Sequence, residues 1–268
     1  MRNCLVRRGI LLLVGLWSLG VWKPIYSQEL SPEELVSAIR QKWSTIQDFQ
    51  ADMTIGVQFL GTLLKIEGTV WQKERLFRAK MLFPPELMPQ MQSKEGTSQV
   101  PPEMLIVFDG KAMWQSMPML PNLVMKTDFS SLEGKAKEVI TPRAFYNLPD
   151  LSYRVSEKNR EGVAYYLLET GDVTQFLHKS VPPGMGINIP KDISFNKVCV
   201  WVNKATLFPE LIEGFTQGDT PAFYLQFKNL KVNQGLPQEL FLFQIPEGAQ
   251  IMDMTAMMKA MTEKMKSP

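Results

Sequence analysis

The segment Phe49-Gln-Ala-Asp-Met-Thr-Ile-Gly-Val-Gln-Phe59 carries the clearest structural pattern of this chain. Apolar residues occupy every second position, and polar residues or glycine occupy the positions between them. Because successive side chains of a β-strand point to opposite faces, this period of two predicts one long strand with an apolar face. The predicted apolar face carries Phe49, Ala51, Met53, Ile55, Val57 and Phe59.

The residues that follow extend this strand into a meander. Gly61-Thr62 predicts a turn, and further strands are predicted at 63–73 and 76–83. Pro84-Pro85 ends the regular pairing, because proline donates no backbone hydrogen bond to a neighbouring strand. Residues 84–103 contain five prolines, so we predict a long irregular insertion there.

The Asp109-Gly110 dipeptide predicts a tight hairpin between strands at 104–108 and 111–117. Both residues tolerate the positive φ angles that two-residue hairpin turns require. We therefore interpret Asp109 as a turn residue and not as a catalytic acid.

The second half of the chain returns to the period of two. In Phe223-Tyr-Leu-Gln-Phe227 the larger apolar side chains again share one face, as expected of a strand with one buried side. A loop of irregular form is predicted at 171–192, and the sequence shows no internal repeat. The predicted strands are 151–156, 164–169, 194–202, 210–216, 222–232 and a short last strand from Phe241 to Phe243.

Helices are predicted in three places. Ser31-Pro-Glu-Glu34 has the pattern of a helix cap and opens a helix with an apolar stripe. The alternation stops over 128–148, where two helices are predicted. Methionines recur at helical spacing over 254–266, and this helix either packs on the outside of the sheet or covers its opening. The predicted fold class is α+β, mainly β: one strongly curved antiparallel sheet with helices on its concave side.

The first 27 residues have the pattern of a secretory signal peptide. Three arginines precede an apolar run from Gly9 to Trp22, and small or turn-forming residues follow it. The run is shorter than the roughly 20 apolar residues that a membrane-spanning helix needs. We expect cleavage near Ser27, with an uncleaved anchor as the alternative, and one domain over 28–268. Cys4 precedes the apolar run, so we expect no lipid on the mature chain.

Charge and cysteine content exclude several classes of function. The chain has 29 basic and 27 acidic residues; four of the basic ones lie in residues 1–27, which leaves 25 basic residues in the mature chain. A nearly neutral protein lacks the basic surface that nucleic-acid binding requires. Cys199 is the one cysteine of the mature sequence, which excludes an intramolecular disulfide.

The inventory of catalytic side chains is small. His178 lies beside Lys179 in a predicted loop, and Cys199 alternates with valines in a predicted strand. A cysteine in such a strand is typical of a small buried apolar residue. We find no metal-ligand spacing and no phosphate-binding loop. The sequence therefore predicts a protein that is not an enzyme and has no cofactor or metal.

Five short motifs, in their order along the chain, resemble one family. They are Ile46-Gln-Asp-Phe-Gln-Ala51, Gly68-Thr-Val-Trp-Gln-Lys73, Arg75-Leu-Phe-Arg78, Phe108-Asp-Gly-Lys-Ala-Met-Trp114 and Phe241-Leu-Phe-Gln-Ile-Pro-Glu-Gly248. Together they resemble the LolA-like outer-membrane lipoprotein carriers, which sort lipoproteins in the periplasm. The resemblance implies an incomplete antiparallel β-barrel closed by a helical lid, with an apolar hollow that holds acyl chains.

The resemblance also implies partners and a lid latch. A monomeric periplasmic carrier takes acyl chains of lipoproteins or lipids from an inner-membrane lipoprotein-releasing transporter and delivers them to an outer-membrane acceptor. Where the family often has Arg-Pro after its Trp-x-Lys segment, this chain has Glu74 and Arg75. Arg75 and Arg78 are therefore the candidates for the residue that latches the lid.

The candidate ligand-binding residues are apolar and lie in the predicted strands and lid. Four methionines, Met53, Met81, Met104 and Met113, either line the hollow or belong to an ordinary core. The alternative function is a sensing or protein-interaction module of the same fold that does not transport its ligand. The full set of candidates is Met53, Ile55, Val57, Phe59, Trp71, Met81, Trp114, Leu132, Phe145, Phe223, Leu225 and Phe227.

Overall fold

The computed structural model describes residues 30–59, 61–84, 103–118, 120–130, 148, 151–171, 195–216 and 220–257. The chain divides into two compact units, Met1–Leu30 and Ser31–Pro268, and the elements below all belong to the second. Several predictions fall on other parts of the chain. They concern the signal peptide, His178, the loop at 171–192, nearly all of the insertion at 84–103, most of the lid at 128–148 and the helix beyond Met257.

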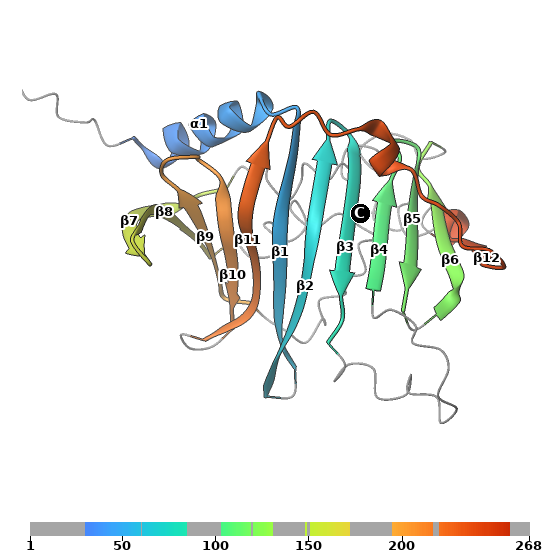
Figure 1. The fold of residues 1–268 in the computed structure, drawn as a ribbon. Coiled ribbons are helices and arrows are strands. Elements are labelled where there is room, and N and C mark those ends of the chain that lie inside the picture. Colours follow the sequence, from blue (N-terminus) through green and yellow to red (C-terminus); the bar gives the residue numbers. More distant parts are fainter. Residues whose placement is uncertain are drawn as a thin grey trace, which may run out of the picture. The chain divides into compact units, whose positions relative to one another are not determined.

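The described residues form one twelve-stranded sheet and a helix, α1, at Pro32–Ser44 (Figure 1). The sheet order is β12-β6-β5-β4-β3-β2-β1-β11-β10-β9-β8-β7. The strands are β1 (Asp48–Phe59), β2 (Thr62–Lys73), β3 (Leu76–Leu82), β4 (Glu103–Phe108), β5 (Ala112–Met117), β6 (Leu120–Asp128), β7 (Arg154–Arg160), β8 (Val163–Thr170), β9 (Lys197–Asn203), β10 (Pro209–Phe215), β11 (Pro221–Val232) and β12 (Gln250–Asp253).

Two meanders, β1 to β6 and β7 to β11, join edge to edge through the antiparallel pair β1–β11. Every pairing is antiparallel except that of β12 with β6, which is parallel. The end strands β7 and β12 do not pair with each other, so the sheet stays open. The predicted fold class is confirmed: a curved, mainly antiparallel sheet forms an incomplete barrel with a helix on one face.

The helix α1 begins as the sequence predicts. Ser31 Oγ accepts a hydrogen bond from the Glu34 backbone N–H at 3.2 Å, and Glu34 Oε2 accepts one from the Ser31 N–H at 2.8 Å. This reciprocal capping box satisfies two N–H groups that have no partner within the helix. The apolar stripe of α1 is buried, and it places Leu35, Val36 and Ile39 in the core of the domain.

The predicted hairpin at Asp109 is confirmed, with its centre one residue further along the chain. The Asp109 N–H donates to the Ala112 carbonyl at 3.1 Å. Gly110, at φ +91°, and Lys111 therefore form the tip of the turn. Asp109 Oδ1 accepts hydrogen bonds from the N–H groups of Lys111 and Ala112, both at 2.8 Å. Asp109 is thus a turn residue, as interpreted.

The predicted last strand at Phe241–Phe243 is wrong. A short 3-10 helix, η3, occupies Gln238–Phe241, and the true last strand, β12, follows it. The two aromatic side chains, two residues apart, mimic a strand pattern, but the backbone here makes local bonds from Leu240 to Pro237 and from Leu242 to Glu239.

Strand β6 was not predicted. Pro121 lies near its start, where proline argues against a strand. From Leu123 to Asp128 the residues of both its faces are buried or half-buried, so its sequence does not alternate between polar and apolar residues.

The segment from Asn233 to Asp253, here called the C-terminal arm, runs from the end of β11 across the sheet to β6 (Figure 1). It is bound at several points by side chains and backbone of the strands that it crosses. Lys73 Nζ donates to the Leu236 carbonyl at 2.6 Å, and Arg78 Nη1 donates to the Leu240 carbonyl at 3.0 Å. The arm ends by pairing with β6, which covers that edge of the first meander.

Candidate functional site

The two faces of the sheet differ in chemistry. The inner face is defined as the one on which α1 packs, and the opposite one is the outer face. On the inner face, paired residues form one unbroken apolar row across seven strands, from β7 to β2. The members of this row are Val155, Leu168, Val200, Ile212, Leu225, Ile55 and Ile66.

Methionines distinguish the other half of the inner face. In a neighbouring row, Phe227 pairs with Met53, which faces Gly68, then Met81 and then Met104. Gly68 has no side chain here because the β3 backbone approaches closely: an added Cβ would lie 2.2 Å from the Lys80 carbonyl oxygen. Met113 on β5 and Met125 on β6 continue the same face. Methionine side chains are flexible and adapt to irregular apolar partners.

Helix α1 closes one end of the inner face. Trp43 packs edge-on against Phe49 with ring centroids 5.9 Å apart, and lies 4.4 Å from Phe208. Its Nε1 donates to the Leu207 carbonyl at 2.9 Å. Burial then decreases along β1: Ala51 is 0% exposed and Met53 is 9% exposed. Val57, near the β1–β2 turn, is half-buried. The inner face is therefore most accessible at the end remote from α1.

Six of the twelve ligand-binding candidates lie together in the middle of the inner face, on β1 and β11, and a seventh lies on β3. Val57 pairs with Phe223, Ile55 with Leu225 and Met53 with Phe227. Their shared face follows from the alternation on which the prediction rests. Phe59 ends β1, but its side chain lies outside the described residues, as do Leu132 and Phe145. The seven inner-face candidates are Met53, Ile55, Val57, Met81, Phe223, Leu225 and Phe227.

The two tryptophan candidates lie on the outer face, away from the other candidates. Trp71 pairs with Gln50 and Arg78, both one residue out of phase with the inner row. Trp114 donates a hydrogen bond to Asp109 Oδ2 at 2.9 Å and stacks on Phe243 of the C-terminal arm, with ring centroids 5.6 Å apart. Trp114 thus anchors the arm.

The two latch candidates do not lie on the inner face either. Arg75 is exposed in the turn between β2 and β3. Arg78 is on the outer face, where its guanidinium donates to the arm at Leu240. Burial lowers the pKa of Arg78, although an arginine stays protonated at neutral pH.

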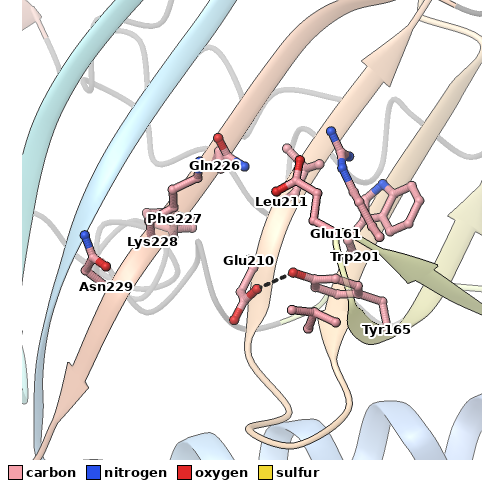
Figure 2. A pocket seen from close by; sticks show the side chains of 11 residues that line it. Glu161, Tyr165, Trp201, Glu210, Leu211, Gln226, Phe227, Lys228 and Asn229 are labelled. Atoms are coloured by element: carbon pink, nitrogen blue, oxygen red, sulfur yellow. Dashed lines mark hydrogen bonds between the residues drawn. The ribbon is translucent and has the colours of Figure 1, made fainter.

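The outer face of β8 to β11 carries paired polar groups and a small buried cluster of Leu167, Cys199 and Phe215 against which Trp201 packs. A pocket of about 280 Å³ there is lined by side chains that include Tyr165, Trp201 and Glu210 (Figure 2). Glu210 accepts hydrogen bonds from the Tyr165 hydroxyl at 2.7 Å and from Asn203 Nδ2 at 2.9 Å. Burial, with the bond to Glu210, raises the pKa of Tyr165 to about 12. These charges and hydrogen bonds make this pocket unsuited to a hydrocarbon chain.

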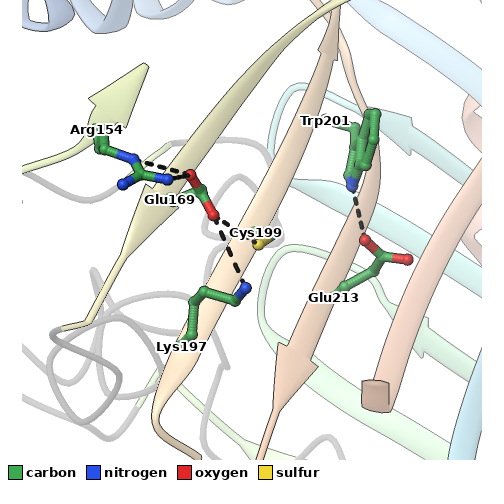
Figure 3. A network of polar contacts seen from close by, with 6 residues as sticks. All are labelled: Arg154, Glu169, Lys197, Cys199, Trp201 and Glu213. Carbon is green, nitrogen blue, oxygen red and sulfur yellow. Dashed lines mark hydrogen bonds and ion pairs between the residues drawn. The ribbon is translucent and has the colours of Figure 1, made fainter. Parts of the chain in front are cut away.

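Cys199 belongs to a second polar network on this face (Figure 3). Glu169 Oε2 forms an ion pair with Arg154 Nη2 at 2.8 Å. Glu169 Oε1 lies 3.8 Å from Lys197 Nζ and accepts a hydrogen bond from the Cys199 thiol at a sulfur-to-oxygen distance of 3.9 Å. Burial raises the pKa of Cys199 to about 11, so its sulfur is a protonated thiol at neutral pH and not a nucleophilic thiolate. Within the described ranges no group of three or more metal-ligating side chains occurs, and no helix is long and apolar enough to cross a bilayer.

Comparison with known proteins gives matches by structure and none by sequence. No family model matches, and no curated protein matches. The chain is similar to an uncharacterized conserved protein from Thermus thermophilus, with a TM-score of 0.50 and 14% identity over 84% of this chain and 99% of that chain. A LolA superfamily protein from Nitrosomonas europaea aligns with a TM-score of 0.30 and 15% identity over 78% and 97% of the two chains. The Mycobacterium tuberculosis lipoprotein LppX aligns with a TM-score of 0.40 and 9% identity over 77% and 99%.

These likenesses concern the fold alone. The open sheet with α1 on its inner face has the architecture that the sequence resemblance implies. The fold is LolA-like. Within this LolA-like fold, the continuous apolar surface is the inner face, and it is the candidate functional site.

Arg40 is a residue of this LolA-like domain that sequence reasoning missed. It lies on α1, and its Nε and Nη2 donate to the Leu148 carbonyl at 3.1 and 2.8 Å. Leu148 is the last residue of the range 128–148 that was predicted as the lid, and Arg40 binds its carbonyl. Arg40 directly follows Ile39, which belongs to the apolar stripe of the helix, and this neighbouring position is the signal that the sequence offered.

We expect Arg40→Met to lower the free energy of unfolding by about 1.5–3 kcal/mol, because two charge-assisted hydrogen bonds to a carbonyl are lost. Urea denaturation of the mature protein measures this change. Lys42→Met is the matched control, since Lys42 is exposed on the same helix and surface substitutions usually change stability by less than about 0.5 kcal/mol. Equal midpoints for the two variants would show that the Leu148 contact contributes nothing.

Proposed function

We propose that this protein is a periplasmic carrier that binds acyl chains of lipoproteins or lipids on its inner face and transfers them toward the outer membrane. The observation that carries the proposal is the apolar row from Val155 to Ile66, which crosses seven strands without a charged residue. A hydrocarbon chain requires such a surface, and it requires no ionic partner.

The energetics of burial support an acyl ligand. Each methylene group moved from water into an apolar site contributes about 0.8 kcal/mol, so a chain of a dozen carbons is held by burial alone. The half-buried residues at the end remote from α1, Val57, Leu64 and Phe223, provide the entrance in this proposal. The methionines deeper in the face adapt to chains of different shape.

The proposed cellular route follows the sequence. A cleaved signal peptide at residues 1–27 delivers the mature chain, a single domain from residue 28, to the periplasm as a monomer. An inner-membrane lipoprotein-releasing transporter supplies the cargo, and an outer-membrane acceptor receives it. The protein performs no catalysis in this proposal, which agrees with a thiol at Cys199 that burial keeps protonated.

Native mass spectrometry of the mature protein, purified from its host without detergent, tests ligand binding directly. We expect a mass above that of the polypeptide, and extraction should release a species that carries acyl chains. A polypeptide that is empty after purification, and stays empty after incubation with a lipidated peptide, would refute acyl binding.

Transfer separates a carrier from a module that only senses its ligand. Donor vesicles that hold a fluorescent lipopeptide are mixed with acceptor vesicles, and the rate of exchange is followed with and without the protein. We expect the rate to rise in proportion to the protein concentration. Binding without acceleration would instead favour the sensing or protein-interaction module.

A further inference from the structure

Gln115 occupies a position on the inner face where the strand pattern calls for an apolar side chain. It lies on β5 between Ile106 on β4 and Met125 on β6. Its neighbour two residues away on the same strand and face is Met113, which belongs to the core. The Gln115 side chain is 7% exposed, so this amide is buried among apolar groups.

One half of this buried amide is unsatisfied. Within the described structure, Gln115 Nε2 has no hydrogen-bond partner. A buried donor without a partner destabilises a folded protein, and native structures contain few of them. Gln72, buried on the same face, differs in which atom lacks a partner: its Nε2 donates to the Glu74 carbonyl at 3.2 Å, and within the described structure its Oε1 is the atom without a donor.

We propose that Gln115 Nε2 donates a hydrogen bond to a carbonyl oxygen of the bound ligand, in an ester or amide of a long acyl chain. This inference rests on the proposed function and deepens it, because it names the ligand's polar group and the place where that group binds. The carbonyl is the acceptor that an otherwise apolar acyl ligand carries, and the surrounding methionines accommodate the chain on either side of it.

The side chains around Gln115 on β4 to β6 are uncharged, and they favour a neutral carbonyl over a carboxylate as the ligand's polar group. The inner-face residues of β4 to β6 are apolar or uncharged, namely Met104, Ile106, Phe108, Met113, Gln115, Leu123, Met125 and Thr127. Lys126, next to Met125, belongs to the outer face, where it lies 5.2 Å from the Trp114 ring. Among the described inner-face residues of these strands a carboxylate would have no cationic partner, so burying a free fatty acid against them would carry a large cost in free energy.

Two probes that differ in one carbonyl group test the proposal. Methyl palmitate and 1-methoxyhexadecane have the same chain length, and each displaces a fluorescent apolar dye from the mature protein. We expect the native protein to bind the ester about tenfold more tightly than the ether, since the hydrogen bond replaces an unsatisfied donor. Gln115→Met, which has a side chain of similar size, should bind both probes equally.

Gln72→Met is the matched control, because it changes a buried glutamine on the same face and leaves Gln115 in place. It should keep the tenfold preference for the ester. A preference unchanged in Gln115→Met, or an equal affinity of the native protein for both probes, would overturn the inference and leave the proposed function standing. Failure of the native protein to bind either probe would overturn both.

Stability of the ligand-free protein gives an independent readout. Gln115→Met removes an unsatisfied donor, so its melting temperature should rise by about 2–4 °C. Gln72→Met also removes an unsatisfied atom, its Oε1, but it loses the hydrogen bond from Nε2 to Glu74, so its melting temperature should rise by less than that of Gln115→Met. A melting temperature that falls in Gln115→Met would show that the amide is satisfied in the native protein, and would overturn the inference.

Discussion

Replacement of Val57 by aspartate is expected to weaken acyl binding by about 100-fold or more while leaving the protein folded. Val57 lies on the inner face between Phe223 and Leu64, at the end where the face is most accessible. When the ligand binds, a carboxylate there either loses its hydration shell to the ligand's methylene groups or keeps water molecules between itself and the ligand. Both outcomes cost several kcal/mol of binding free energy. Because Val57 is only half-buried, the empty protein can keep the new charge hydrated.

Dye displacement by methyl palmitate measures this effect, and circular dichroism confirms the fold. Gln58→Asp is the matched control: it adds the same charge one residue along β1, on the outer face opposite Leu63. Its affinity should stay within about twofold of the native value, the size of effect typical of substitutions outside an interface. If both variants bind normally, the ligand does not pass Val57.

The period-two pattern explains why much of the sheet could be predicted from the sequence. Successive residues of β1 point alternately to the core and away from it, so the pattern in Phe49–Phe59 predicts both the strand and the face that is buried. The same reasoning placed Phe223, Leu225 and Phe227 on the inner face. These assignments depend on local alternation alone, which a sequence displays directly.

The two tryptophan candidates lie on the face opposite to the other described strand candidates. In β2 the residues in phase with Val70 are Leu64, Ile66 and Gly68, and Trp71 is out of phase with them. Trp71 is one of the ligand-binding candidates, but the phase of the strand places it on the outer face. On this sheet the outer face also buries aromatic groups, because the C-terminal arm covers part of it, as the stack of Phe243 on Trp114 shows.

Contacts between distant segments could not be predicted from the pattern. The pairing of β1 with β11 joins Met53 to Phe227, and the bond from Arg40 reaches Leu148. Such contacts depend on how the meanders fold together, which local spacing does not encode. Gln115 is a different case: a polar residue at an inward position of a strand is visible in the sequence, and it is a signal of function or strain.

Replacement of Asp48 by alanine is expected to lower the free energy of unfolding by about 3–5 kcal/mol, a larger loss than that expected of Arg40→Met. Asp48 begins β1 and is 4% exposed. Its carboxylate accepts hydrogen bonds from three successive backbone N–H groups at the start of the C-terminal arm, those of Gln234 at 2.7 Å, Gly235 at 2.9 Å and Leu236 at 3.3 Å. Each bond lost to a charged acceptor leaves a donor unsatisfied, at a cost of about 1–3 kcal/mol.

The effect should extend beyond the turn, because these bonds begin the path of the arm. The Asp48 carbonyl also accepts from the Asn233 N–H at 2.8 Å, and Gly235 adopts φ +71°, so the carboxylate binds three successive N–H groups of a turn that includes a left-handed residue. Without it, the arm should loosen from its start toward β12, and the edge of β6 that β12 covers should open. Unpaired strand edges favour aggregation, so we expect Asp48→Ala to aggregate at lower temperature than the native protein.

Urea unfolding and amide hydrogen exchange over 233–253 measure the two consequences separately. Asp52→Ala is the matched control, since Asp52 lies on the same strand but is exposed and makes one side-chain bond, to Asn229 Nδ2 at 2.7 Å. We expect this control to lose less than about 1 kcal/mol and to leave exchange in the arm unchanged, because a single exposed hydrogen bond contributes little. Similar unfolding midpoints for the two variants, with equal protection of the arm, would mean that the arm is held by Lys73, Arg78 and the β6 pairing, and that Asp48 only shapes the turn.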